Sequence, residues 1–139
     1  MFEDERVIQK VALWVEKAEN DLRNAGHTLK IKQKCPTDTV CFHAQQCVEK
    51  YLKALLVWRE VEFPRAHDIT HLLKRLAPRD QPDLTPDECE QLTDYATVNR
   101  YPGDYPPITL QEARQAVKIA RRVRKQIRAR LPKQALRLK

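Results

Sequence analysis

Hydrophobic residues are most densely arranged over residues 38–58, a segment with neither Gly nor Pro. On a helix turning about 100° per residue, this segment has one broad apolar face. Because so wide an apolar arc needs more than one neighbour, the pattern predicts that this helix is central. It should end near residues 60–63, because Pro64 disfavours a helical conformation of the residue before it. The face consists of Val40, Cys41, Ala44, Cys47, Val48, Tyr51, Leu52, Ala54, Leu55 and Trp58.

Two long amphipathic stripes flank this segment in sequence. The first predicts a helix over residues 4–30, with apolar positions three or four residues apart: Val7, Val11, Trp14, Ala18, Leu22, Ala25 and Leu29. The last stripe follows a capping-box pattern at residues 109–112 and ends before Pro132. It consists of Ala113, Ala116, Val117, Ala120, Val123, Ile127 and Leu131.

Shorter helices are predicted between the central and last segments. Asp68 is a suitable N-cap for one short helix, and a capping box at residues 85–88 opens another that ends at the Pro-rich segment 100–108. Together the patterns predict an all-α fold, an up-and-down helical bundle of four main helices plus a short fifth. We expect a single domain over residues 1–132, followed by a frayed basic tail over residues 133–139.

Composition excludes several other classes. Two glycines in 139 residues argue against a turn-rich β protein and against a Gly-rich phosphate loop. No apolar run approaches the ~18 residues of a membrane span, and the charged start is unlike a secretory signal. The four cysteines form no CxxC pair, which favours buried thiols in a reducing compartment, and we expect a cytoplasmic protein.

A histidine pair invites a metal interpretation. His67 and His71 are four residues apart, but Asp68 as N-cap would place His67 outside the helix, and the sequence supplies no third ligand beside them. We therefore expect neither a metal nor a cofactor.

Charge is divided unevenly along the chain, whose net charge is +7. Residues 1–113 hold 15 basic and 19 acidic residues, whereas residues 114–139 hold 11 basic residues and no acidic one. These cations either only solvate an amphipathic helix or bind a phosphate backbone or an acidic partner. The candidates for binding are Arg121, Arg122 and Lys125.

The polar side of the central helix is a second candidate site. His43, Gln46, Lys50 and Lys53 fall within an arc of roughly 80°. This strip is either a solvated flank with a Glu49–Lys53 ion pair, or a surface facing a groove, a ligand or a second subunit. Asp21, which borders the first stripe, is likewise either a solvated edge residue or a partner for a basic group on the next helix.

These residues resemble the HEPN domain family. The resemblance rests on Asp21 between Ala18 and Ala25, the run FHAQQCVEKYLKALL at residues 42–56, the turn with His67, and RYP at residues 100–102. It covers about residues 5–130 and implies a helical bundle, homodimerisation, and pairing with a minimal nucleotidyltransferase in toxin–antitoxin-like or defence systems. It also implies nucleotide or RNA chemistry, since many members are metal-independent endoribonucleases.

The sequence departs from the ribonuclease pattern of that family. Those members use an arginine and a histidine separated by four to six residues; here Arg100 is followed at these positions by Tyr105 and two prolines. A phenol with a pKa near ~10 is a poor base at neutral pH. His43, on the predicted central helix, could supply the base instead, but it would then form a site different from that of the family. The cluster of Arg100, Tyr101, Asp104 and Tyr105 either packs the turn or forms a platform for anions or bases.

Three functions follow from these patterns. The first is a non-catalytic HEPN-family module that binds nucleotide or RNA, or docks a nucleotidyltransferase. The second is an endoribonuclease with a displaced site, Arg100 with His43 or Tyr105. The third is a homodimer that interacts only with proteins. The apolar residues Phe42 and Val57 within the polar arc favour such a dimer. The missing histidine disfavours the second, and the basic last helix favours the first.

Overall fold

The computed structural model of the chain describes residues 2–96 and 106–137. Within these residues the structure is helical and contains no strand, so the predicted all-α fold is confirmed. In order, the elements are α1 (Phe2–Leu29), α2 (Thr37–Trp58), α3 (Ile69–Lys74), the 3₁₀ helix η1 (Pro78–Asp80), α4 (Pro86–Tyr95), α5 (Leu110–Arg128) and α6 (Lys133–Arg137).

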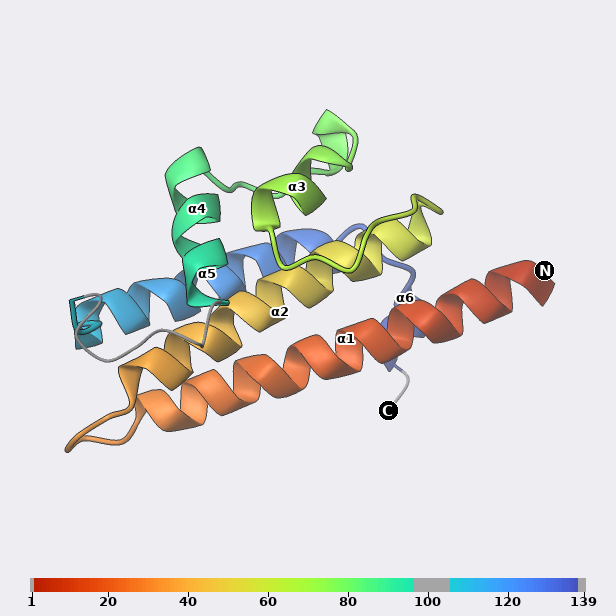
Figure 1. The fold of residues 1–139 in the computed structure, drawn as a ribbon. Coiled ribbons are helices and arrows are strands. Elements are labelled where there is room, and N and C mark those ends of the chain that lie inside the picture. The colour runs from red at the N-terminus through yellow and green to blue at the C-terminus, as the bar shows by residue number, and fades with distance from the viewer. Residues whose placement is uncertain (1, 97–105, 138–139) are drawn as a thin grey trace.

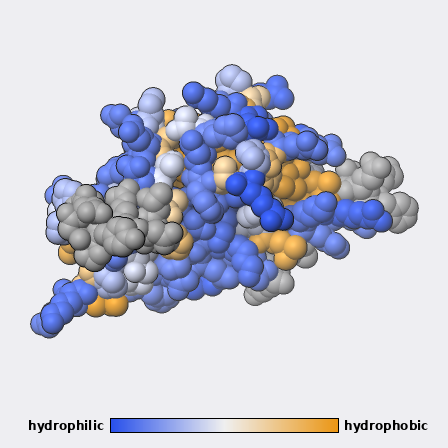
Figure 2. All heavy atoms as spheres, in the orientation of Figure 1, coloured by the Kyte–Doolittle hydropathy of each residue, from blue (hydrophilic) through white to orange (hydrophobic). Residues whose placement is uncertain are grey.

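Helix α2 is the centre of the molecule. It packs along α1 on one side and α5 on the other, while α3 and α4 lie across it as a smaller second layer (Figure 1). Hydrophilic residues cover most of the face seen in Figure 1, interrupted by smaller hydrophobic patches (Figure 2). None of the helices in the described part of the chain is long and apolar enough to cross a membrane.

The core confirms the predicted face of α2 and corrects part of α1. Tyr51, Leu55 and Val123, which lie on the predicted apolar faces, are fully buried, and so is Leu72 on α3. Trp14 and Leu22, on the predicted stripe of α1, are partly buried and pack against this core, while Ala12 and Val15, outside that stripe, are buried as well.

Trp14 and Leu22 have different neighbours. Trp14 meets Phe63 edge to face at 6.3 Å between ring centroids and lies under the ammonium of Lys53. Leu22 lines a surface hollow, described below.

Helix boundaries follow the predicted caps, with two exceptions. Asp68 and Thr85 accept hydrogen bonds from the backbone N–H groups of His71 and Glu88, and the Thr85–Glu88 capping box is complete. At α5, Thr109 caps the helix, but the carboxylate of Glu112 accepts a hydrogen bond from the Tyr95 hydroxyl at 2.5 Å instead of closing the predicted box.

The second exception is the end of α2, at Trp58 and not near residues 60–63. The chain turns there because Glu60 adopts a left-handed conformation with φ of 58°, and the N–H groups of Glu60 and Val61 bond back to the carbonyls of Val57 and Leu56. These are the two hydrogen bonds of a Schellman motif.

The predicted frayed tail is wrong for residues 133–137. They form α6, which packs against α1, and Ala135 is only 1% exposed. The turn after Pro132 allows this, since its carbonyl accepts a hydrogen bond from the Ala135 N–H at 3.0 Å.

Candidate functional site

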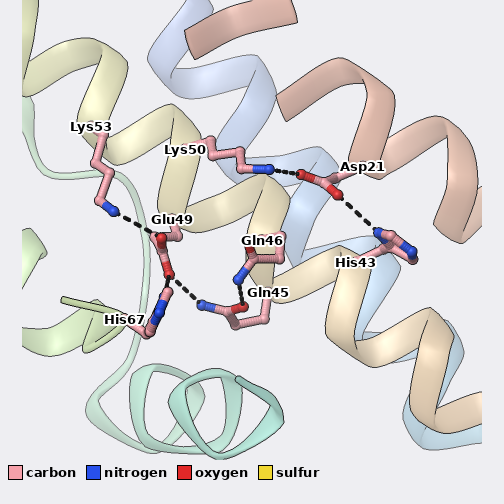
Figure 3. A network of polar contacts seen from close by, with 8 residues as sticks. All are labelled: Asp21, His43, Gln45, Gln46, Glu49, Lys50, Lys53 and His67. Carbon is pink, nitrogen blue, oxygen red and sulfur yellow. Dashed lines mark hydrogen bonds and ion pairs between the residues drawn. The ribbon is translucent and has the colours of Figure 1, made fainter. Parts of the chain in front are cut away.

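Asp21 joins α1 to the polar strip of α2. Its carboxylate bonds His43 Nδ1 at 2.8 Å and accepts a hydrogen bond from Lys50 Nζ at 2.6 Å (Figure 3). Asp21 is 7% exposed, and His43 and Lys50 are about one quarter exposed at their side chains. Of the two interpretations of Asp21, the partner for basic groups on the next helix is therefore the right one.

Glu49 is the centre of a second polar cluster. It accepts hydrogen bonds from Lys53 Nζ and Gln45 Nε2 at 2.9 Å each, and its Oε1 lies 2.9 Å from His67 Nδ1 (Figure 3). Gln45, Glu49 and Lys53 are all buried, so the predicted Glu49–Lys53 pair exists but does not lie on a solvated flank. Burial alone would raise the pKa of Glu49, but the hydrogen bonds from Lys53, His67 and Gln45 outweigh it and hold that pKa below its ordinary value.

The predicted polar strip thus divides into two clusters. His43 and Lys50 bind Asp21, Lys53 binds Glu49, and Gln46 donates to the Gln45 side-chain oxygen at 2.7 Å. These bonds cross-link α1, α2 and the segment before α3. An imidazole held by a carboxylate at one nitrogen can accept a proton at the other, so His43 has one part of an acid–base site.

Two arginines of α5 pair with acids on opposite sides of the helix. Arg122 pairs with Glu88 at 3.0 Å and also donates to the Asp83 carbonyl, while Arg124 donates twice to Glu19, at 2.7 and 2.9 Å. Arg122, one of the three predicted binding cations, is therefore held in an ion pair. Its acidic partner lies on α4, and folding brings the two helices together.

Four other cations of α5 form an exposed row, which we call the α5 cation stripe: Arg114, Lys118, Arg121 and Lys125. Their spacing of three or four residues keeps them on one side of the helix. No carboxylate of the described residues forms an ion pair with any of the four. Two of the three predicted binding cations, Arg121 and Lys125, thus have no ion-pair partner within the described part of the chain.

A surface hollow of about 550 Å³ lies between α1 and α5 beside this stripe. We call it the α1–α5 hollow, and its lining consists of Glu19, Leu22, Arg23, Gly26, His27, Lys30, Arg121, Arg124 and Lys125. The contributions of α1 were missed in the sequence. The available signal was the placement of Arg23, His27 and Lys30 four and three residues apart, which puts them on one side of α1.

The single acid of the hollow is already neutralised. Glu19 accepts hydrogen bonds from Arg124 and from the Tyr51 hydroxyl, the latter at 2.5 Å. Burial would raise the pKa of Glu19, but these hydrogen bonds and the charge of Arg124 hold that pKa below its ordinary value. Burial, followed by the nearby Glu19, raises the pKa of the Tyr51 phenol, which stays protonated and donates to the carboxylate.

Several predicted residues lie elsewhere. Arg100, Tyr101, Asp104 and Tyr105 are outside the described residues. The described part of the chain contains no group of three potential metal ligands, and the His71 imidazole accepts a hydrogen bond from Arg75.

Three of the four cysteines are buried thiols, as expected from the sequence: Cys41, Cys47 and Cys89. The fourth, Cys35, is partly exposed. Burial raises the pKa of the Cys41 thiol to about 12, which makes it unreactive at neutral pH.

The arrangement defines a class: an all-α bundle in which buried polar clusters cross-link the helices around a central one. A family model for the HEPN domain matches residues 11–130, and the chain belongs to this family. The crystal structure of an archaeal HEPN homologue is similar, with a TM-score of 0.66 and 27% identity over 86% of this chain and 96% of that chain. No curated protein matches. The predicted family resemblance is confirmed.

Proposed function

We propose that this chain is a non-catalytic HEPN-family module that binds RNA through its phosphate backbone. The observation that carries the proposal is the α5 cation stripe, in which four exposed cations on one side of a helix have no acidic partner among the described residues. Unbalanced cations in a row attract a polyanion and release its counterions on binding.

The length of the stripe favours RNA over a single nucleotide. Arg114 and Lys125 are eleven residues apart, about 16 Å along a helix, which is longer than one nucleotide but suits several backbone phosphates. No aromatic residue follows Tyr105 in the sequence, so the last helix offers no stacking surface for bases. We therefore expect binding that tolerates many sequences.

Charge reversal on the stripe tests this proposal. In Arg121→Glu with Lys125→Glu, we expect binding of single-stranded RNA, measured by fluorescence anisotropy, to weaken at least about tenfold. The loss of two phosphate contacts should also reduce the slope of log affinity against log salt by about 1.4. Thermal stability should change little, since neither side chain forms an ion pair with a described residue.

A matched control separates the site from overall charge. Arg6→Glu with Lys10→Glu makes the same change in charge at the same four-residue spacing on an exposed part of α1, and should retain most of the affinity. Equal weakening by both double variants would contradict a site on α5.

Metal-independent RNA cleavage is not expected. Arg100 lacks a histidine at the family spacing. General acid–base catalysis is typically worth 10²–10⁴-fold, so without it mainly phosphate positioning would be left. In an assay with labelled RNA and EDTA, we expect the native chain to match Arg100→Ala and His43→Gln. Efficient cleavage that either substitution abolishes would establish the displaced site instead.

Two further expectations follow from the family and stay predictions. One is homodimerisation, and the other is docking of a minimal nucleotidyltransferase. An acidic partner surface would use the same cations as RNA, so RNA should then compete with the partner protein for the chain.

A further inference from the structure

We propose that residues 61–67, which connect α2 to α3, form a strap that opens and closes over the buried Glu49–Lys53 pair, with His67 as its pH-sensitive fastener. We call these residues the strap. From the end of α2 the strap runs back along this helix to the start of α3 (Figure 1). The inference does not depend on the proposed RNA binding, because the residues that carry it lie outside the α5 cation stripe.

The strap is an irregular segment with little buried surface of its own. Its residues belong to no helix, four of them are exposed, and none is buried. Among the described residues, its backbone hydrogen bonds run from the Val61 N–H to the Leu56 carbonyl and from Arg75 Nη1 to the Glu62 carbonyl. Segments with so few buried contacts open locally at a lower free energy than the core of a protein.

Two side chains fasten the strap to the helices beneath it. The Phe63 ring meets Trp14 of α1 edge to face, with 6.3 Å between the ring centroids. His67 Nδ1 lies 2.9 Å from Glu49 Oε1 on α2, and this nitrogen donates because an ionised carboxylate only accepts (Figure 3). The His67 side chain is 67% exposed and that of Glu49 is 3% exposed, so the imidazole lies between solvent and the buried pair.

The surface beneath the strap is charged, which makes opening less costly than exposing an apolar core. Glu49 accepts a hydrogen bond from Lys53 Nζ at 2.9 Å, and both residues are buried. When the strap lifts, water regains access to the carboxylate and the ammonium, and their hydration offsets part of the lost contacts. Apolar side chains in the same place would gain no such compensation. The strap can therefore open while the rest of the bundle stays folded.

Histidine makes the fastening depend on pH. Histidine ordinarily changes its charge between pH 5 and 8, and Nε2 of His67 has no hydrogen-bond partner among the described residues, so it can take up a proton without breaking the Nδ1 bond. Glu49 stays ionised in this range, since its hydrogen bonds hold its pKa below the ordinary value. An imidazolium attracts the carboxylate more strongly than a neutral imidazole does. The strap is thus held more firmly at mildly acidic pH and loosens above neutrality.

The other groups around the strap do not reproduce this dependence. Lys53 binds Glu49 from α2, and lysines, arginines and carboxylates ordinarily keep their charges between about pH 5.5 and 8.5. Helix α1 faces the pair with an uncharged aromatic ring. His71 of α3 accepts a hydrogen bond from Arg75, which also holds the Glu62 carbonyl. Protonation of His71 would repel Arg75 and loosen the strap at low pH, which is the opposite direction.

Limited proteolysis with trypsin tests the strap, because Arg65 is an exposed cleavage site within it. The rate of cleavage after Arg65 in the full chain is divided by the rate in a synthetic peptide of residues 60–70, which corrects for the pH dependence of trypsin. At low trypsin concentration this cleavage ratio follows the population of the open strap. We expect the cleavage ratio to be about two- to fivefold higher at about pH 8.5 than at about pH 5.5, as for an exposed ion pair.

Two variants make the result specific to the fastener. His67→Gln should remove the pH dependence, because an amide can donate to Glu49 but does not titrate, and its cleavage ratio should stay near that of the native chain at about pH 8.5. His71→Gln is the matched control. It should keep or increase the pH dependence, because this imidazole bonds Arg75 and not Glu49. A native cleavage ratio that does not change with pH, or one that changes equally in His67→Gln, would overturn the inference.

Cleavage after Lys53 separates local from global opening. Lys53 is buried within α2, so trypsin reaches this bond only after the helix unfolds. In the native chain, cleavage after Arg65 should be at least about tenfold faster than cleavage after Lys53, each relative to a peptide of the same sequence. Equal relative rates at the two sites would mean that the chain is cut after Arg65 only when it unfolds globally, and the proposed strap would be refuted.

Discussion

In Leu55→Ala, the free energy of unfolding should fall by about 2–5 kcal/mol, measured by urea denaturation at pH 7. Leu55 is fully buried on α2, the helix that α1 and α5 both cover, so truncation removes apolar contacts and leaves a cavity that its neighbours cannot easily fill.

Leu13→Ala is the matched control, because it removes the same atoms from a side chain that is 61% exposed on α1. It should change the free energy of unfolding by less than about 0.5 kcal/mol. Similar effects of the two substitutions would show that the packing of α2 is not as described here.

In Glu49→Gln, we expect a loss of about 3–5 kcal/mol in the free energy of unfolding. The substitution keeps the shape of the side chain but leaves the buried ammonium of Lys53 without its carboxylate, 2.9 Å away in the native chain. Glu90→Gln, on the exposed side of α4, is the control and should be nearly neutral.

The same substitution should alter the dependence of stability on pH. The pKa of Glu49 is lower in the folded chain than its ordinary value of 4.5, so the folded state binds fewer protons than the unfolded state in this range. The stabilisation is present above that ordinary value and is lost as the pH falls through the lower folded pKa. The native chain should therefore lose stability more steeply below about pH 5 than Glu49→Gln does. Parallel pH profiles of the two proteins would contradict a charged, paired Glu49.

Local sequence patterns predicted most of the fold. The apolar face of α2, the caps at Asp68 and Thr85, and the all-α class each depend on residues within a few positions of one another. The tail was mispredicted because its few apolar residues form no long stripe, and α6, which holds the buried Ala135, packs against α1, far away in sequence.

The candidate site was harder to predict because its partners are distant in sequence. Arg122 meets Glu88, 34 positions earlier, and Arg124 meets Glu19, 105 positions earlier. Charge counts along the chain showed an excess of cations but not which of them folding would neutralise. Likewise, the i,i+4 spacing predicted the Glu49–Lys53 pair, but its burial depends on how the neighbouring elements pack around it.

The contacts between α5 and the second layer have a consequence for motion. Arg122, Gln126 and Arg130, four residues apart, bind groups in residues 79–88 through partly exposed hydrogen bonds and ion pairs. Short helices held in this way open at a lower free energy than long helices with buried apolar faces. Amide protons of α3 and α4 should thus exchange with solvent through local opening while those at the centre of α2 stay protected. Added salt should speed the exchange of α4 in particular, because it screens the ion pair between Glu88 and Arg122 that links α4 to α5.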